Sequence, residues 1–491
     1  MASIKGELEK IVGSQNVLTD EPTLKRYAQD QSFVQPRRPD MVVFVENVEQ
    51  IQKIVRLANA TRTPLVPYSS GKNLRGATIP DHGGIILNMS RMNAIIEVDR
   101  ENLFAVIEPG VTYRQLQDAL APHGLRVMTP FGIVPERSVL TSYLERDPVL
   151  AAPSFEDGNA LIMDTELVLP NGDLFRTGNW ASGGRPGAPN GPIRNTIYRL
   201  WTGSQGTLGI MTKMAVQVSF IPADRKIFFI PFEHIADAVE PIRRIQRREI
   251  GTECFLLNRF NLAALFAQDW SVPNDIPAPP VRSEDFALLR QHLPPWVLII
   301  VINGPMRRTQ EKIAYEAEAL QEVCDILNLE LREALPHVPG AEQVIADELL
   351  RPWGILKKFN FKGSVHDLTF KTPLNNLPNV TEIVTNLALR YGYPESDIGM
   401  FVLPLERARA LHVEIDLHCP SAECSERTMV KELWLTASGR LVDAGGYFDR
   451  PYGAWAPLMY GRAAQYTQML RKLKAEMDPN NILNPGKLCF A

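Results

Sequence analysis

Two glycine-rich stretches hold the residues best suited to bind a ligand. The first reads PYSSGKNLRG over residues 67–76 and follows an apolar segment that ends at Val66. Its small residues let the backbone pass close to a ligand, and successive N–H groups in such a turn can converge on an anion. Lys72 and Arg75 add positive charge. The stretch predicts a loop that wraps a diphosphate, with an ordinary surface turn as the alternative.

The second stretch reads GSQGTLGIMTK over residues 203–213. Three glycines stand there beside apolar residues, and glycines in such a setting often mark a place where backbone or ligand approaches closely. We expect this segment to lie against a flat ligand.

A third candidate lies far downstream, in the segment RALHVEID that ends at Asp416. Its alternation predicts a strand on which His412, Glu414 and Asp416 share one face. A polar face of this kind would line a cavity. The alternative is a histidine that is only hydrogen-bonded within the core.

The surrounding elements show how these residues are positioned. A strand at 41–45, a helix capped by Asn47 and a strand at 64–66 form a β-α-β unit that delivers the chain into the first loop. This start indicates an α+β or α/β nucleotide-binding domain. Further strands are expected at 84–89, 94–98, 103–108, 159–169 and 214–220.

The later chain predicts a different unit. Residues from about 225 to 440 alternate between strand-like and helix-like segments, which indicates an antiparallel sheet covered by helices. A helix at about 461–477 and the segment DPNNILNPGK end the chain. We therefore divide it into residues 1–222, a substrate domain at 223–440, and a C-terminal segment at 441–491.

Composition narrows the functional classes. A chain of 491 residues is too long for one core. The net charge of −4 gives no support for nucleic-acid binding. No apolar run approaches the roughly 18 residues that cross a bilayer, and the N-terminus lacks a signal-peptide core. Five scattered cysteines without a CxxC pair fit a reducing cytoplasm and predict no metal site.

Four motifs in order resemble a known family: SSGKNLRG, EPGVTYRQL, GSQGTLGIMTK and DPNNILNPGK. They are similar to the FAD-binding fold shared by vanillyl-alcohol oxidase and the flavoprotein subunit of 4-cresol dehydrogenase, with the flavin-linked 2-hydroxy-acid dehydrogenases as wider relatives. The resemblance covers residues 35–220 and 400–491 well and the middle in outline. It implies an α+β fold in which a two-part FAD-binding domain carries an antiparallel-sheet cap domain over the substrate.

The resemblance also implies which residues hold FAD. They come from the first loop, from a segment at 138–146, from the second glycine-rich stretch and from the C-terminal segment. The set is Pro67, Ser69, Ser70, Gly71, Lys72, Asn73, Leu74, Ser138, Val139, Ser142, Glu145, Arg146, Gly209, Ile210, Arg450 and Lys487.

Within the family, the loop sequence SGKNL resembles the alkylphenol branch most. That likeness places Asp157 on an active-site acid, His412 on a cavity histidine and Arg450 beside the flavin pyrimidine edge. A carboxylate at Asp157 could stabilise a cationic or quinone-methide-like product or take a proton from an attacking water, and a fixed guanidinium could stabilise the reduced flavin. The alternatives are a turn aspartate at Asp157, with Glu156 as the fallback acid, and a surface ion pair between Arg450 and Asp449.

The chain departs from this branch where the branch binds a phenolate with tyrosines. Leu74-Arg75-Gly76 replaces one tyrosine site, and Asp449, which we count with the catalytic residues, replaces the other. A buried phenolate beside Asp449 would be repelled unless another cation compensates. His366 lies near the position where the branch attaches FAD covalently. The alternative there is a polar loop histidine.

Three functions follow from these residues. The first is an FAD-dependent dehydrogenase or oxidase that removes a hydride from a benzylic or alcohol carbon of an aromatic, alkylphenol-like substrate. The second is a glycolate- or D-lactate-type 2-hydroxy-acid dehydrogenase, with Arg407 or Arg409 as the carboxylate anchor. The third is a non-catalytic flavin-binding subunit. We expect a cytoplasmic homo-oligomer that passes electrons to oxygen, a cytochrome or another carrier.

Overall fold

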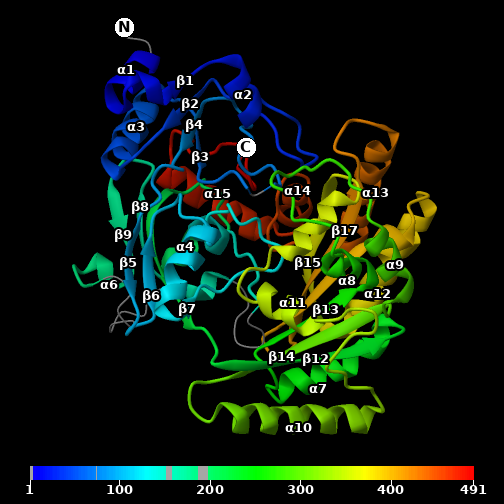
Figure 1. Cartoon of the computed structure of the whole chain (residues 1–491). Helices are drawn as coiled ribbons and strands as arrows, with labels where there is room; N and C mark the ends of the chain where they lie inside the picture. The colour runs from blue at the N-terminus through cyan, green and yellow to red at the C-terminus, as the bar shows by residue number, and fades with distance from the viewer. Residues whose placement is uncertain (1–3, 73, 151–157, 186–196, 491) are drawn as a thin grey trace.

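The computed structural model describes residues 4–72, 74–150, 158–185 and 197–490 of the chain (Figure 1). The chain forms two α+β halves, and its C-terminal segment returns to the first half. Among the described residues, no helix is both long enough and apolar enough to pass through a bilayer.

The first half begins with a four-stranded sheet in the order β1-β2-β4-β3. Its strands are β1 (Val17–Leu18), β2 (Met41–Phe44), β4 (Ile85–Asn88) and β3 (Leu65–Tyr68). The last three pair in parallel, and α3 (Val48–Thr61) makes the crossover from β2 to β3. The Asn47 side chain caps α3, whose buried face includes Ile51, Ile54 and Val55. The predicted β-α-β unit is therefore present, and β3 ends where the first loop begins.

A second sheet, antiparallel throughout, completes this half in the order β5-β6-β10-β8-β9. Its strands are β5 (Ile95–Asp99), β6 (Phe104–Ile107), β10 (Ile210–Gln217), β8 (Ile162–Val168) and β9 (Leu174–Arg176). The remaining short elements of this half are α1 (Ile4–Val12), α2 (Glu21–Tyr27), α4 (Tyr113–Leu120), β7 (Leu125–Arg126), α5 (Val139–Leu144), α6 (Gly178–Ala181) and β11 (Ser219–Phe220).

The second half is built on a six-stranded antiparallel sheet in the order β12-β14-β13-β16-β17-β15. Its strands are β12 (Asp224–Phe232), β14 (Trp296–Gly304), β13 (Glu253–Asn258), β16 (Gly399–Leu405), β17 (Ala410–Cys419) and β15 (Ser364–Thr372). This is the antiparallel sheet that the sequence predicted for the cap.

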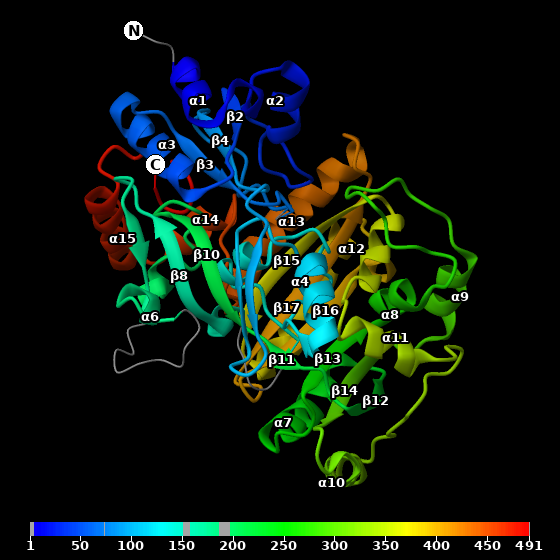
Figure 2. The ribbon, with the colours of Figure 1, turned by 60° about the vertical axis from the view of Figure 1, so that its left-hand side comes forward.

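Helices cover both faces of the cap sheet, so that each face has its own apolar core (Figure 2). One core includes residues of α7 (Val239–Arg247), α10 (Thr309–Leu327), α12 (Leu377–Arg390) and α13 (Ser425–Asp443). The other includes residues of α8 (Arg259–Phe266), α9 (Glu284–His292) and α11 (Ala341–Glu348). With both faces covered, polar side chains of the sheet must face a cavity or a partner.

Strand pairing fixes the polar face of β17. His412 lies opposite Lys371 of β15, Glu414 lies opposite Thr369, and Asp416 lies opposite Asp367. A slip of one residue would turn this face into the apolar core. The register therefore decides which side chains reach the junction with the first half.

The C-terminal segment ties the two halves together. After α14 (Trp455–Tyr460) and α15 (Ala464–Met477), Leu483 forms a parallel bridge with Leu65 of β3, and the N–H of Asn484 donates to the Leu65 carbonyl at 2.8 Å. Lys487 donates to the Gly76 carbonyl at 3.3 Å and forms an ion pair with Asp81 at 3.0 Å. Figure 1 shows α15, in red, beside the blue and cyan elements of the first half.

A substitution of Leu483 tests whether the C-terminal segment stabilises the fold. Its side chain is fully buried under the first sheet, so Leu483→Ala should lower the free energy of unfolding by about 2–5 kcal/mol in a urea titration. Met469→Ala on α15 is the control, because that side chain is 65% exposed and its loss should cost less than about 0.5 kcal/mol. Equal effects of the two substitutions would contradict a closing role for Leu483.

Candidate functional site

The loop that follows β3 borders four cavities. Its shape depends on Gly71, which has a φ of 66° and on which a Cβ would overlap the Tyr68 phenol oxygen. Only glycine fits this conformation and this contact. The Ser70 hydroxyl accepts a bond from the Ser138 N–H at 3.0 Å, and the hydroxyls of Ser69 and Thr141 lie 2.7 Å apart. The loop is therefore fixed to the start of α5.

One cavity, which we call the distal groove, lies on the side of β3 and α5. It has a volume of about 720 Å³, and its lining includes Pro67, Thr141, Trp201, Gly206 and Gly209. Both predicted glycine-rich stretches thus meet in this groove. An outer cleft shares Thr78 with it and continues past Gly71 to Lys72 and Leu74.

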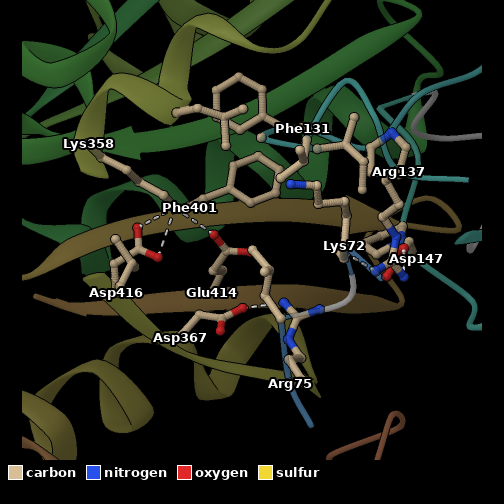
Figure 3. A pocket seen from close by; sticks show the side chains of 18 of the residues that line it. Lys72, Arg75, Phe131, Arg137, Asp147, Lys358, Asp367, Phe401, Glu414 and Asp416 are labelled. Atoms are coloured by element: carbon tan, nitrogen blue, oxygen red, sulfur yellow. Dashed lines mark hydrogen bonds and ion pairs between the residues drawn. The ribbon is translucent and has the colours of Figure 1, made fainter. Parts of the chain in front are cut away.

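The next cavity, which we call the charged cavity, lies between the two halves and has a volume of about 760 Å³ (Figure 3). It shares Lys72 and Leu74 with the outer cleft. Its charged lining residues are Lys72, Arg75, Arg137, Asp147, Lys358, Asp367, Glu414, Asp416 and Arg450. Five cations and four anions face one small space, so their pairing decides what the cavity can bind.

Asp147 lies between two arginines. Its carboxylate pairs with Arg137 at 2.7 Å and with Arg450, and it accepts a bond from the Ser142 hydroxyl at 2.7 Å. Burial alone would raise the pKa of Asp147, but the two guanidinium groups lower it from 3.8 to about 2. The Nε atoms of Arg137 and Arg450 are buried without a hydrogen-bond partner in the described part of the chain. These two N–H groups remain available to a ligand acceptor.

A second cluster forms on the cap side. The Lys358 ammonium lies 2.9 Å from carboxylate oxygens of both Glu414 and Asp416. Burial raises the pKa of Glu414 to about 7, although the nearby Lys358 opposes this shift. Arg75 pairs with Asp367 at the edge of the same cavity (Figure 3). Glu414 is thus a carboxyl of this cavity whose charge state changes near neutral pH.

The apolar wall of the charged cavity is aromatic. The rings of Phe131 and Phe401 lie with their centroids 4.9 Å apart, and His412 meets Phe401 edge-on at 6.1 Å. His412 is buried, and burial together with the charge of Arg450 lowers its pKa to about 3, so the imidazole is neutral. Figure 3 shows Lys72 reaching from the loop toward these rings.

The predicted catalytic residues differ in where they lie relative to the charged cavity. Arg450 and His412 both line the charged cavity. The alternative of a surface ion pair for Arg450 is wrong, because its side chain is buried against Asp147. Asp449 is buried outside that cavity's lining and pairs with Lys371 at 3.1 Å, so the compensating cation required at this position is present. Asp157 and Glu156 lie outside the described residues.

The predicted FAD contacts spread along the line of cavities. Four of them, Pro67, Ser69, Glu145 and Gly209, line the distal groove. The outer cleft is lined by Ser70, Gly71, Lys72 and Leu74, of which the last two also line the charged cavity with Arg450. The others support these walls or are tied to neighbouring segments: Ser138, Val139, Ser142, Arg146, Ile210 and Lys487. Asn73 lies outside the described residues.

His366 lies in a wall of Phe33 and Arg427 beside the charged cavity. Its ring stacks on Phe33 at 3.9 Å, and its Nε2 lies 3.1 Å from Arg427. It lines a separate apolar cavity, not the charged one. This arrangement gives no support to a covalent bond between His366 and FAD, which stays a prediction.

Sequence reasoning missed several lining residues. Arg137, Asp147, Lys358 and Asp367 are charged side chains outside any recognised motif. The partner of Arg137, Asp147, is ten residues away, but Asp147, Lys358 and Asp367 also pair with residues far away in the chain. A usable signal existed only for Arg137, which directly precedes the predicted contact Ser138. The part of the chain that the structure describes contains no group of three or more His, Cys, Asp or Glu side chains placed to hold a metal ion.

Comparisons with known proteins agree with this geometry. The family model "FAD binding domain" matches residues 39–178, and the model "FAD linked oxidases, C-terminal domain" matches residues 454–488. The glycolate oxidase subunit GlcD of Bacillus subtilis is 25% identical over 99% of this chain and 96% of its own length. The 4-cresol dehydrogenase flavoprotein subunit of Pseudomonas putida is 31% identical over 47% of this chain and 45% of its own.

Solved structures show the same fold. The structure of p-cresol methylhydroxylase with substrate bound superposes with a TM-score of 0.83, and so does 4-ethylphenol oxidase from Gulosibacter chungangensis. Each is 20% identical and covers 99% of this chain and 96% of its own. The predicted α+β fold with an antiparallel cap is confirmed.

The residues present fit FAD. An elongated dinucleotide needs adjoining cavities, small residues at the diphosphate and donors at the flat ring. The distal groove, the outer cleft and the charged cavity adjoin one another through shared lining residues, and Gly71 keeps the backbone open between them. The unpartnered Nε atoms of Arg137 and Arg450 supply buried donors at the far end.

A substitution of Asp147 tests its ion pairs with Arg137 and Arg450. Because its pKa is depressed in the folded state, the pairs contribute about 2 kcal/mol above pH 4, and this contribution is lost as the pH falls from about 4 to about 2. Asp147→Asn should lower the free energy of unfolding at pH 7 by about 3–5 kcal/mol, because two buried cations then lack their partner. Its acid unfolding curve should also be flatter between pH 4 and pH 2.

The matched control is Asp173→Asn, which removes an exposed carboxylate that pairs with Arg56 at 3.6 Å. That change should lower the free energy of unfolding by less than about 1 kcal/mol and leave the acid unfolding curve between pH 4 and pH 2 unchanged. If Asp147→Asn had the same free energy of unfolding and the same acid unfolding curve as the wild type, the ion pairs of Asp147 would not stabilise the fold.

Proposed function

Since this chain belongs to the FAD-linked oxidase family of the vanillyl-alcohol oxidase and p-cresol methylhydroxylase type, we propose that it removes a hydride from a benzylic or alcohol carbon of an aromatic substrate. Its class, an FAD-linked oxidase or dehydrogenase, follows from the family. The choice of an aromatic substrate is our own proposal.

The observation that carries the proposal is the aromatic wall of the charged cavity. Phe131 and Phe401 pack together there, and Phe255 extends the cluster with a centroid 5.5 Å from Phe131. Stacked or tilted aromatic pairs gain about 0.5–1.5 kcal/mol beyond the burial of their area, so such a wall favours a flat ring. The opposite side of the cavity carries the charged groups that a hydroxyl or phenol requires.

The structure removes the carboxylate anchors expected for a 2-hydroxy acid. Arg407 and Arg409 lie in the turn between β16 and β17, where both side chains are exposed and pair with Glu249 and Glu406. Neither lines the charged cavity. The prediction that one of them binds a substrate carboxylate therefore has no support from the lining of this cavity.

The proposal gives separate roles in the reaction to several charged side chains of the charged cavity. FAD, when bound, accepts the hydride that leaves the substrate carbon. Arg450 and Arg137 keep their positive charge at all working pH values and would hold the electron-rich edge of the ring through their free N–H groups. Asp147 keeps these two cations side by side despite their mutual repulsion.

Glu414 is the residue that would take the proton. Oxidation of an alcohol carbon releases one proton from the hydroxyl as the hydride leaves, so a base is required within the cavity. A carboxylate with a pKa of about 7 is well matched to this work, whereas His412, with a pKa of about 3, is a weak base. Lys358 then stabilises the cluster by remaining protonated beside Asp416.

Anaerobic bleaching of the flavin tests the function. The FAD-loaded protein, mixed with 4-cresol, vanillyl alcohol, D-lactate or glycolate, should lose its visible flavin absorbance with an aromatic compound and keep it with the two acids. Bleaching by glycolate or D-lactate alone would overturn the proposal. Bleaching by dithionite but by none of the four would favour a flavin-binding subunit without catalysis.

Glu414→Gln tests the base. The substitution keeps the shape of the side chain but removes its basicity, so kcat with the aromatic alcohol should fall about 10²–10⁴-fold. The decline of kcat/KM below about pH 7, where Glu414 becomes protonated in the wild type, should disappear. Glu432→Gln on the exposed side of α13 is the control and should retain both rate and pH profile. A wild-type profile in the Glu414 variant would assign the proton transfer elsewhere.

A 2-hydroxy acid is the second candidate. Two observations favour it: the match to glycolate oxidase subunit GlcD spans almost the whole chain, and Lys72 lines the charged cavity with no ion-pair partner among the described residues. Lys72 would then hold the substrate carboxylate in place of the two surface arginines.

A further inference from the structure

A second large cavity opens beside the charged one. We call it the aromatic cavity. It has an internal volume of about 320 Å³ and lies between the segment at 32–34, α13 and the residues that lead into α14. This volume is typical of a site that encloses a small organic molecule. None of the groups assigned above to proton transfer lines it.

Its walls are stacked aromatic rings. Phe33 stacks on His366 at 3.9 Å and meets Trp434 edge-on at 5.8 Å, and Trp434 stacks on Trp455 at 4.9 Å. The Trp434 indole N–H already donates to the Asp367 carbonyl at 3.0 Å, and the Trp455 indole N–H donates to the Ser438 hydroxyl at 2.8 Å. The indole donors are thus satisfied, and the surface left to a ligand is mainly aromatic.

The two cavities adjoin each other. Leu74, Arg75, Val365 and Asp367 line both of them, so the ion pair between Arg75 and Asp367 lies at their junction. A molecule that reaches past this ion pair would place one end beside Phe401 and Glu414 and the other end among the tryptophans. Both ends of the path suit rings, because each is lined by aromatic side chains.

The outer rim of the aromatic cavity carries one cation. Lys431 of α13 lines the cavity, is partly exposed, and has no ion-pair partner among the described residues. Leu435, one turn further along α13, is 42% exposed at the same rim. An apolar surface beside an unpaired ammonium group matches an aromatic body that ends in an anionic group.

We propose that the aromatic cavity binds the distal ring of a two-ring substrate whose reactive alcohol carbon lies in the charged cavity and whose far end is anionic. This inference rests on the proposed function for the reactive end only. It assigns Trp434 and Trp455 to binding of the distal ring, and Lys431 to the anionic end. A one-ring alcohol fills only the charged cavity, so it gains nothing from these residues.

The test compares two ligands on FAD-loaded protein. 4′-(Hydroxymethyl)stilbene-4-carboxylate has two rings and an anionic end, whereas vanillyl alcohol has one ring. Binding is measured by calorimetry, independently of turnover, and flavin bleaching is followed in parallel. Ala454→Phe fills the aromatic cavity from its exposed rim and should weaken binding of the stilbene about tenfold or more. The rate of bleaching by vanillyl alcohol should stay unchanged.

Two matched controls separate the cavity from the rest of the surface. Leu389→Phe adds the same side chain at a 61% exposed position of α12 outside the cavity and should leave binding of the stilbene unchanged. Lys431→Glu should weaken binding of the stilbene about three- to fivefold, whereas Lys472→Glu on exposed α15 should not.

Equal affinity of the wild type and Ala454→Phe for the stilbene would overturn the assignment of the aromatic cavity. Failure of the proposed function gives a different result. In that case the stilbene still binds in a way that depends on Ala454 and Lys431, but neither aromatic alcohol bleaches the flavin.

Discussion

The active region depends on one carboxylate held between two guanidinium groups. Asp147 pairs with Arg137, ten residues before it, and with Arg450, 303 residues after it. Removing three charged groups from water is expensive, and their attraction offsets that cost only when the geometry is good and the remaining polar atoms find partners. The Ser142 hydroxyl supplies one such partner from the protein, and the cofactor would supply others. Two buried cations thus share one carboxylate, which leaves a net positive charge suited to an electron-rich ligand group.

The cost of burying an unpaired charge also explains why the cap domain carries a buried cation, Lys358. Glu414 and Asp416 point from β17 into the junction, and without Lys358 two buried carboxylates would face each other. Burial raises the pKa of Glu414 to about 7, because the shared lysine offsets only part of the cost of desolvation and the neighbouring Asp416 carboxylate adds to it. The same three side chains can therefore form a structural ion cluster and also provide a proton acceptor.

Local patterns in the sequence predicted a substantial part of this arrangement. The β-α-β start, the loop at 67–76 and the alternation of β17 depend on short-range periodicity and turn chemistry, and the structure contains all three. The fold was predictable because four motifs occur in family order. The ion pairs were not, because no local rule links Asp147 to Arg450 or Lys358 to Asp416. Lys371 compensates Asp449 through tertiary packing, although 78 residues separate them in the chain.

The closing contact between Leu483 and Leu65 also bears on the order of events during synthesis. After the ribosome completes the loop at 67–76, more than 400 further residues must be added before the segment at Leu483, which bridges to β3, emerges. At translation rates of about 5–20 residues per second, this delay is roughly 20–80 s. During that interval the nascent first half lacks both its edge partner and Arg450, so firm retention of the cofactor would await synthesis of the C-terminal segment at 441–491.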